Sequence, residues 1–350
     1  MGYCSLLGIL RQKNYIYISY LHYDKYVKYV LNEVILMHIR RLVKAGQASH
    51  TISLPKEWLD KNKLGKGATL YIHEKSDSEL LITPHLAGHS TSEQKAVTIQ
   101  VDGKELDTIQ REITAAYVNN ASNIDLVGET ISKHAKEIRR MLHDFVALEI
   151  SEQTANRISA KDLLNLQEIS VDKSIKRMDV IVRTMLQDCK ITVTGKDLSE
   201  SVMFRDYDVN RLYFLLARLL KSSLSNPSMA AQLQISPPKV LGKWMLVHYV
   251  EQLADAVKGL CADCGTLDAK QRKNVSALLG QLEQDYLDTM KAVHEKNAKL
   301  ADEIARRRIE RQMSCASLSA ELPNAAHGCS TISSLLSDIA RLVIDEEKEN

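Results

Sequence analysis

The chain has 350 residues, and its 46 Lys and Arg residues against 44 Asp and Glu residues leave a formal net charge of +2. Any basic surface is therefore local, and the length is enough for two or three domains. The six cysteines are scattered without a framework, which is typical of a reducing cytoplasm and argues against a disulfide-stapled secreted fold.

Residues 1–37 differ from the rest of the chain. Seven of the 13 tyrosines lie there, and charged residues such as Arg11 and Asp24 interrupt the apolar stretches. No run reaches the roughly 18 apolar residues of a membrane span, and no signal-peptide cleavage site follows, so stable membrane insertion is not expected. We hypothesise that Met37 is the true start. The alternative is a short helix that packs on the following domain.

Residues 38–86 read as two strands, a short helix and two more strands. The strands are expected at 39–44, 49–54, 70–73 and 80–83, because these runs are short, alternating and rich in β-prone residues. Pro55 opens the helix, and Gly65 and Gly67 are expected to end it. About 45 residues are too few to bury a core alone, so this ββαββ unit is expected to pair with a second copy of itself.

Four segments of this unit, RRLVKAG, SHTISLPKEWL, GKGATLYI and ELLITP, resemble the SpoVT/AbrB (MazE-like) family of DNA-binding domains. The resemblance implies that two chains interleave their hairpins into one swapped-hairpin β-barrel, so that the protein is a homodimer. It also implies that basic residues on the barrel face and loop contact DNA. These residues are Arg40, Arg41, Lys44, Lys56 and Lys66.

The charge of the same unit indicates binding to nucleic acid, independently of the resemblance. Residues 40–66 contain seven Lys and Arg residues but only two acids, Glu57 and Asp60. Such a local excess is typical of phosphate neutralisation, although a solvated basic face is the alternative. Arg40 and Arg41 would point to opposite faces of a strand, so at most one of them would face a given surface.

Residues 95–165 are predicted to form a small βαβαβ module. KAVTIQVDG and NIDLVG read as strands, 105–118 reads as an amphipathic helix, and a second helix is expected to be capped by Ser132. The segment 147–164 reads as an irregular strand pair. The module has neither a glycine-rich phosphate loop nor clustered acids, so it is either a spacer or a dimerisation layer.

Residues 166–350 are predicted to be almost entirely helical. One long helix is expected over 270–312, where apolar residues recur at near-heptad spacing with a gap at Asn297. A loop is expected over 313–330, followed by a last helix. Long helices of this kind pack lengthwise on neighbours of similar length.

RDYDVNRLYFLLARLL and VEQLADAVKGL within this part resemble helices of the PhoU family of phosphate-signalling proteins. The family motif, an acid followed four residues later by Asp, corresponds to Glu251 and Asp255. Carboxylates at i and i+4 share a helix face, so a divalent or ferric ion is the cofactor that the resemblance implies, with Asp206 as a third ligand. Ser330 and Ser334 stand where the second acid pair would fall, which argues against several metal ions; a solvated acid pair is the alternative.

Other candidate sites carry less information. Cys261 and Cys264 form a CxxC at a helix end, and a zinc site would require Cys315, Cys329 or His327 to fold close to them; two idle thiols are the alternative. The histidines on helices have no companions at ligand spacing, and Trp58 and Trp244 are expected to be packing anchors. No acid pair has a matched nucleophile or base, so an enzyme is not expected.

The sequence thus predicts an α+β protein with a swapped-hairpin β-barrel, a βαβαβ module and an all-α PhoU-like helical bundle. We expect a cytoplasmic, dimeric DNA-binding transcriptional regulator in which a ligand or partner of the bundle changes the arrangement of the DNA-binding faces. The resemblance implies negative control of phosphate uptake through a phosphate transporter or its sensor. The alternatives are a PhoU-like adaptor that uses the barrel only for dimerisation, and an antitoxin-like module, against which the long folded chain after the barrel argues.

Overall fold

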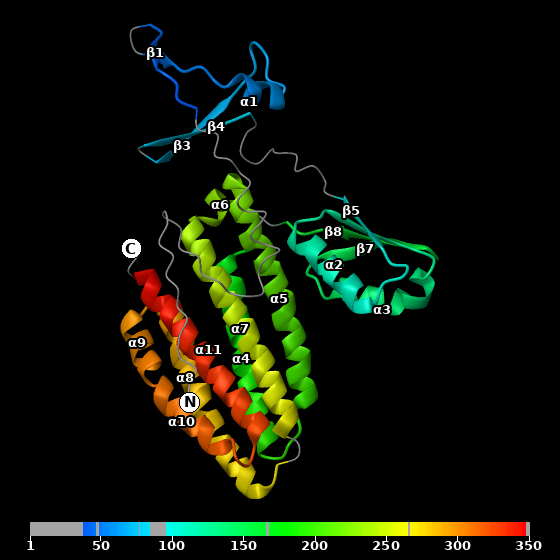
Figure 1. Cartoon of the computed structure of the whole chain (residues 1–350), viewed down its shortest axis with the longest axis vertical. Coiled ribbons are helices and arrows are strands. Elements are labelled where there is room, and N and C mark those ends of the chain that lie inside the picture. The colour runs from blue at the N-terminus through cyan, green and yellow to red at the C-terminus, as the bar shows by residue number, and fades with distance from the viewer. Residues whose placement is uncertain are drawn as a thin grey trace, which may run out of the picture. The chain divides into compact units, whose positions relative to one another are not determined.

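The structure is a computed structural model of one chain (Figure 1). It describes residues 38–46, 49–76, 78–84, 96–165, 168–264 and 267–347. The predictions for residues 1–37, including a start at Met37, lie outside these ranges. The chain divides into two compact units, with the boundary between Leu86 and Ala87.

The first unit has the predicted order of elements. These are β1 (Val43–Lys44), β2 (His50–Thr51), α1 (Lys56–Lys61), β3 (Tyr71–Ser76) and β4 (Glu79–Thr83). β1 pairs with β2 and β3 with β4, each antiparallel, and no sheet among the described residues closes into a barrel. The first two strands are much shorter than expected, because a two-stranded ribbon without further partners is only marginally stable.

The end of α1 differs from the prediction. The helix stops at Lys61, before either glycine, and the Asn62 side chain donates to the Trp58 carbonyl over 2.7 Å. Lys63 then adopts the left-handed conformation, with φ of 54°, that was expected of a glycine. The turn therefore depends on an Asn–Lys pair rather than on glycine.

No described residue of the first unit is buried. Ile72 and Ile82 are paired across the β3–β4 hairpin, and Leu80 lies on the same face two positions along. Ile72 is 63% exposed and Leu80 is 65% exposed, and Ile39, Leu42, Val43 and Ile52 are also largely exposed. Among residues 38–84, the described part of this unit therefore leaves the apolar face of the hairpin largely exposed.

The second unit begins with an α/β module that has its own core. Its elements are β5 (Ala96–Gln100), α2 (Leu106–Val118), β6 (Asn123–Val127), α3 (Ile131–His143), β7 (Leu148–Gln153) and β8 (Arg157–Asp162). The sheet order is β5-β6-β8-β7, with β5 parallel to β6 and the other pairs antiparallel. The module is thus βαβαββ rather than βαβαβ, because the irregular strand pair supplies two full strands.

The start of α3 also differs from the prediction. The helix begins at Ile131, one residue before the expected cap at Ser132. The Asp102 carboxylate, at the end of β5, accepts from the backbone N–H groups of Glu129 and Thr130, each over 2.8 Å, and from the Thr130 hydroxyl over 2.6 Å. Asp102, which is distant in sequence, therefore accepts hydrogen bonds from the free N–H groups at the start of α3. The local sequence pattern does not predict this.

The rest of the second unit is a helical bundle. Its helices are α4 (Val171–Val193), α5 (Ser199–Ser225), α6 (Pro227–Leu233), α7 (Pro237–Asp263), α8 (Ala269–Glu295), α9 (Ala298–Arg306), α10 (Arg308–Leu318) and α11 (Pro323–Glu347). The long helices α4, α5, α7, α8 and α11 run lengthwise beside one another (Figure 1). This arrangement agrees with the predicted α+β class, with helices and sheets in separate parts of the chain.

The single helix predicted over 270–312 is wrong. Lys296 is left-handed, with φ of 52°, and the Asn297 side chain accepts from the Leu300 N–H over 3.0 Å, so α8 ends and α9 begins there. The loop predicted over 313–330 is also largely helical, because α10 continues to Leu318 and α11 begins at Pro323. Within the described residues, no helix is long and apolar enough to cross a membrane.

The module packs firmly on α5. The Arg218 side chain, 2% exposed, donates to Asn120 Oδ1 over 2.9 and 2.7 Å and forms an ion pair with Asp162. Its guanidinium also lies over the Tyr117 ring, 4.8 Å from the centroid. These contacts join the module to the bundle; whether the module acts as a spacer or as a dimerisation layer stays a prediction.

Candidate functional site

Asp206 on α5 and Glu251, Asp255 and Lys258 on α7 form what we call the acid–lysine cluster. The Lys258 ammonium lies 2.6 Å from Asp206 Oδ2 and 2.5 Å from Asp255 Oδ1. The three predicted metal ligands are therefore brought to one place, but around a lysine that the sequence interpretation did not single out.

The helical period of α7 places these groups on one face. Glu251, Asp255 and Lys258 lie at i, i+4 and i+7, whereas Val250, Leu253, Ala254 and Val257 lie on the face that is buried in the bundle core. Asp206 comes from the neighbouring helix and is only 4% exposed. Its Oδ1 atom is buried with no hydrogen-bond partner among the described residues, and Asn210 donates to its Oδ2 over 3.3 Å.

Burial and like charge shift the acidity of the cluster. Desolvation raises the pKa of Glu251 to about 7, and the negative charges of Asp255 and Asp206 add to this effect while Lys258 opposes it. Burial likewise raises the pKa of Asp206, although its hydrogen bond from Lys258 acts in the opposite direction. Glu251 therefore changes its charge close to neutral pH.

These residues do not fit a metal ion as the resemblance implies. The Lys258 ammonium already occupies the position between two carboxylates where a cation would bind. Within the described residues, no three His, Cys, Asp or Glu side chains are placed so that they could hold a metal ion. We therefore assign the charge compensation of this cluster to Lys258 rather than to a metal.

A groove of about 480 Å³ adjoins the cluster between α7 and α11. Asp255 belongs to both the cluster and the groove, so a molecule in the groove would meet the cluster directly. The remaining lining is mostly polar or small: Gln252, Ala256, Gly259, Leu260, Asp263, Asn324, His327, Gly328 and Thr331.

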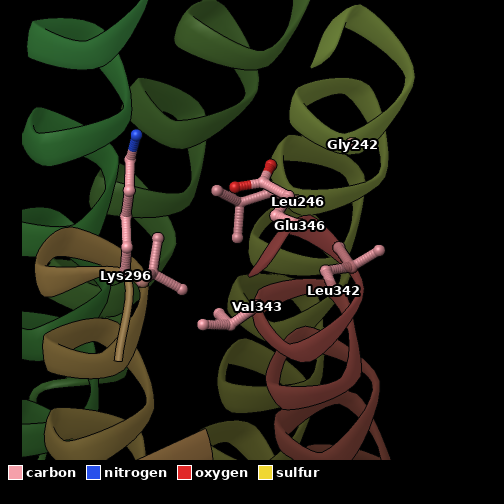
Figure 2. A pocket seen from close by; sticks show the side chains of 7 residues that line it. Gly242, Leu246, Lys296, Leu342, Val343 and Glu346 are labelled. Atoms are coloured by element: carbon pink, nitrogen blue, oxygen red, sulfur yellow. The ribbon is translucent and has the colours of Figure 1, made fainter. Parts of the chain in front are cut away.

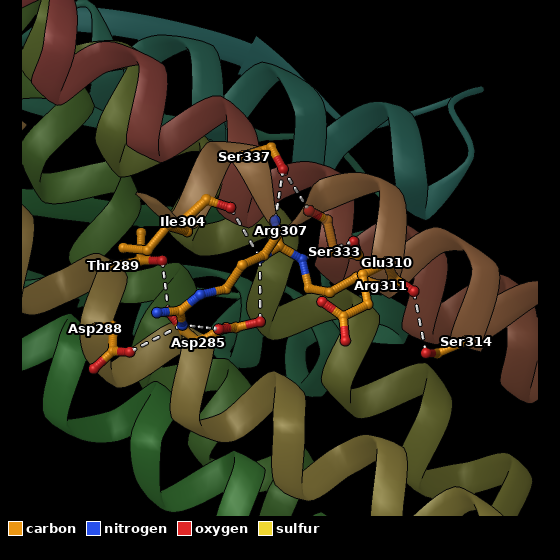
Figure 3. Close-up of polar contacts among 10 residues, drawn as sticks. All are labelled: Asp285, Asp288, Thr289, Ile304, Arg307, Glu310, Arg311, Ser314, Ser333 and Ser337. Carbon is orange, nitrogen blue, oxygen red and sulfur yellow. Dashed lines mark hydrogen bonds and ion pairs between the residues drawn. The ribbon is translucent and has the colours of Figure 1, made fainter. Parts of the chain in front are cut away.

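A second polar cluster is buried between α8, α10 and α11. The Arg311 guanidinium donates to Asp285 over 3.1 Å, to Ser333 over 3.1 Å and to Ser337 over 2.8 Å (Figure 3). Arg307 donates to the other oxygen of Asp285 over 2.8 Å. All polar groups are paired, so the cluster ties three helices together.

The serines of this cluster are not the predicted ones. Ser333 and Ser337 are fully buried and contact Arg311, whereas Ser330 and Ser334 are half-buried. Sequence reasoning missed Arg311 and Asp285, because a lone arginine and a lone aspartate on long helices are usually solvated. The only indication that Arg311 and Asp285 are buried is that they stand among the apolar residues of α10 and α8.

A small cavity of about 110 Å³ lies between α7, the end of α8 and the end of α11. Its walls are mainly apolar, with Leu246, Val293, Leu342 and Val343. The side chains of Lys296 and Glu346 rise on opposite sides of it (Figure 2). Sequence patterns do not indicate this cavity, because its lining comes from three distant segments.

The predicted DNA-binding residues Arg40, Arg41, Lys44, Lys56 and Lys66 are all exposed. None of them forms an ion pair with a described residue. Arg40 and Arg41 precede β1, so the expectation that they point to opposite faces of a strand does not apply. Contact with DNA stays a prediction.

The remaining candidates are placed as follows. Trp244 packs against the bundle core as expected. His294 is not isolated, because its Nε2 lies 2.9 Å from the buried Asp179 carboxylate, which also accepts both ends of the Arg183 guanidinium. Cys261, Cys264, Cys315 and Cys329 do fold into one region of the bundle, and all are buried.

Comparison with known proteins adds little. No family model and no curated protein matches the sequence. The crystal structure of PhoU from Pseudomonas aeruginosa matches with 14% identity and a TM-score of 0.38, over 51% of this chain and 96% of that chain. At this TM-score and identity, the likeness carries neither a fold nor a function to this chain.

Proposed function

We propose that this protein is a dimeric DNA-binding transcriptional regulator whose helical bundle receives the regulatory signal. The observation that carries the proposal is the first unit, whose described residues include exposed basic side chains and an exposed apolar hairpin face but no buried residue. A unit without a core of its own is expected to gain one by assembling with a second copy.

Assembly would cover the apolar residues and leave the basic ones in solvent. Ile72 and Leu80 are the residues that a second hairpin would bury. Arg40, Arg41, Lys44, Lys56 and Lys66 would then be doubled across the dimer, and phosphate contacts of this number supply most of the affinity of non-specific DNA binding. The barrel that the SpoVT/AbrB resemblance implies is one way to achieve this assembly.

The proposed signal is phosphate status. Its support is the resemblance of the α5 and α7 segments to the PhoU family, which implies negative control of phosphate uptake through a transporter or its sensor. The acid–lysine cluster and the adjoining groove are where we place the receiving surface, because Glu251 responds to its electrostatic surroundings near neutral pH. Occupation of the groove would favour one arrangement of the paired DNA-binding units.

The test is DNA binding by full-length protein in which Arg40, Arg41 and Lys44 are changed to Ala. A matched control carries Lys133→Ala, Lys136→Ala and Lys173→Ala, which remove the same charge from exposed sites of the second unit. We expect the first variant to lose at least about tenfold in affinity and to show a smaller salt dependence, by about 0.9 per lost phosphate contact. Equal affinity of the two variants would contradict the proposal.

A second function is favoured by one exposed pair on α10. Ile309 is 71% exposed and Met313 is 69% exposed, and at i and i+4 they lie on one face of the helix. This apolar pair suits an adaptor that binds a partner protein while the first unit serves only dimerisation. Loss of partner binding in Met313→Asp together with normal dimerisation and no DNA binding would support the adaptor.

A further inference from the structure

The cavity between α7, the end of α8 and the end of α11 is separate from both polar clusters. Its volume is about 110 Å³, and it shares no lining residue with the groove beside Asp255. Four aliphatic side chains form most of its wall: Leu246, Val293, Leu342 and Val343. The charged residues Lys296 and Glu346 complete the lining together with Gly242. An apolar space with a few polar groups at its edge is the usual composition of a small-molecule site.

Short side chains explain why space remains at this junction of helices. Val343 also belongs to a small apolar core between α8, α9 and α11, in which three of the five buried members are alanines: Ala292, Ala301 and Ala340. Short side chains fill a junction of helix ends less completely than long ones. A cavity of about 150 Å³ holds benzene, which has six carbon atoms, so a cavity of this smaller volume suits about four.

Gly242 is an unusual residue for the wall of this cavity. It lies inside α7 rather than at an end, and it has no positive φ angle that would require glycine. Apart from proline, glycine is the least favourable residue in a helix interior. A Cβ atom at this position would lie 3.0 Å from Glu346 Oε1, which is closer than ordinary van der Waals contact. The glycine therefore leaves room for the Glu346 carboxylate at the edge of the cavity.

Lys296 is a second unusual residue at the same cavity. It is left-handed, with φ of 52°, at a helix end where glycine or asparagine is the usual choice. It is exposed, and its side chain rises on one side of the cavity, whereas that of Glu346 rises on the opposite side (Figure 2). The apolar space is thus flanked by one ammonium group and one carboxylate.

We propose that this cavity binds a free aliphatic α-amino acid such as leucine. The four-carbon side chain of leucine would fill the apolar space, its carboxylate would pair with Lys296, and its ammonium group would pair with Glu346. A carboxylate has about four lone-pair positions, so Glu346 can accept from the ligand in addition to its contacts within the protein. A terminal residue of a peptide carries only one of the two charges, which favours the free amino acid.

The ligand would join three helices at one end of the bundle. Gly242 lies on α7, Lys296 separates α8 from α9, and Glu346 lies in the last turn of α11. A ligand that binds only the folded protein raises its stability, so the amino acid should also raise the melting temperature. The site does not depend on DNA binding by the first unit, and either proposal can fail without the other.

The test is titration calorimetry of the full-length protein with L-leucine. We expect a dissociation constant on the order of 0.1–1 mM, which suits a ligand of this size. Three analogues each lack one feature: 4-methylpentanoate has no ammonium group, 3-methylbutylamine has no carboxylate, and glycine has no apolar side chain. Each should bind at least about tenfold more weakly than leucine. Equal affinity for any one of them would overturn the proposal.

Two variants show whether leucine binds at this cavity. Lys296→Gly removes the ammonium group and gives the left-handed position its preferred residue, so the fold should be at least as stable as that of the wild type. Glu346→Gln removes the carboxylate charge but keeps the shape of the side chain. We expect each variant to lose at least about tenfold in affinity for leucine.

Gln234→Gly is the matched control for Lys296→Gly. Gln234 is also left-handed, with φ of 51°, and it lies outside the cavity lining. This variant should bind leucine as tightly as the wild type does. Unchanged affinity in both Lys296→Gly and Glu346→Gln would overturn the proposal, and so would the absence of leucine binding by the folded wild-type protein at about 10 mM.

Discussion

The Lys258 ammonium lies 2.6 Å from Asp206 Oδ2 and joins α7 to α5 at the place where the sequence predicts a metal ion. A built-in cation of this kind makes the charge balance of the bundle independent of metal supply. It also leaves one carboxyl, that of Glu251, to gain and lose a proton near neutral pH. Four predictions follow from the arrangement of these and neighbouring residues.

Lys258→Ala should destabilise the protein and create a metal site. Removal of the ammonium leaves Asp206 buried with an uncompensated charge, which costs about 3 kcal/mol of unfolding free energy at pH 7. A divalent cation could then bind between Asp206, Glu251 and Asp255, so millimolar Mn²⁺ should raise the melting temperature of the variant but not of the wild type. Thermal unfolding with and without Mn²⁺ measures both effects.

The control for this variant is Lys243→Ala. Lys243 pairs with Asp172, whose side chain is 72% exposed, so its loss should cost less than about 1 kcal/mol and confer no response to Mn²⁺. If the wild type itself gained stability from Mn²⁺ as strongly as Lys258→Ala does, Lys258 would not be the cation of the cluster.

Glu251→Gln should change how stability depends on pH. The folded pKa of Glu251, about 7, lies above its ordinary value of 4.5, so the folded state holds this proton more tightly than the unfolded state. The proton stabilises the fold below pH 4.5, and this contribution is lost as pH rises to about 7. The glutamine variant avoids the loss and should be more stable than the wild type by about 1 kcal/mol at pH 8.

Denaturant unfolding of both proteins between pH 4.5 and pH 8 measures this difference. The two stability curves should converge toward pH 4.5 and separate as pH rises. Parallel curves over the whole range would mean that Glu251 does not titrate there. The groups facing Glu251 are Asp255, Asp206 and Lys258. Asp255→Asn should therefore lower the folded pKa of Glu251 and make the separation at pH 8 smaller, because one repelling charge is lost.

Arg218→Met should loosen the α/β module from the bundle. Arg218 is buried and pairs with Asp162 and Asn120, so its loss leaves a buried carboxylate without its partner and should cost about 3–5 kcal/mol. Arg306→Ala, which breaks an exposed pair with Asp302, should cost less than about 1 kcal/mol. Protection of α2 amides in hydrogen exchange should fall only in the first variant; equal losses in both would contradict the role of Arg218.

Leu80→Asp should prevent the first unit from dimerising. A charge on the exposed hairpin face cannot be buried against a second copy without a large desolvation cost. We expect light scattering to give a wild-type mass of twice 39.4 kDa and a variant mass near 39.4 kDa. Ile309→Asp places the same charge on an exposed apolar site of the second unit and should stay dimeric. If the wild-type protein were a monomer in this measurement, the proposal that two first units share one core would be contradicted.

Local patterns predicted the elements of this fold well but not their partners. The ββαββ order, the long helices and the shared face of Glu251 and Asp255 follow from local spacing. That Asp206 lies beside them was implied only by the resemblance, because it stands on another helix. Lys258 was missed because a surface lysine near acids is usually just solvated. Arg218 and Arg311 were missed because their partners lie far away in the sequence, where no period links them.

The breaks between helices were missed for a similar reason. The heptad pattern shows a gap at Asn297. The helix is divided there because Lys296 is left-handed, and a lysine does not predict that conformation. The convergence of five cysteines from four regions of the chain is likewise a product of helix packing. Of this convergence, the sequence predicts only that Cys261 and Cys264 lie close together, because they form a CxxC motif.

The most direct test of the central claim is fluorescence anisotropy of the full-length protein with DNA over a salt series. The DNA would be its own promoter, a phosphate-transporter promoter and a scrambled sequence. We predict tight binding that prefers one promoter and weakens steeply with salt, as expected when several phosphates are contacted. A dimeric protein that binds none of the three at low salt would contradict DNA binding and leave the helical bundle as the functional part.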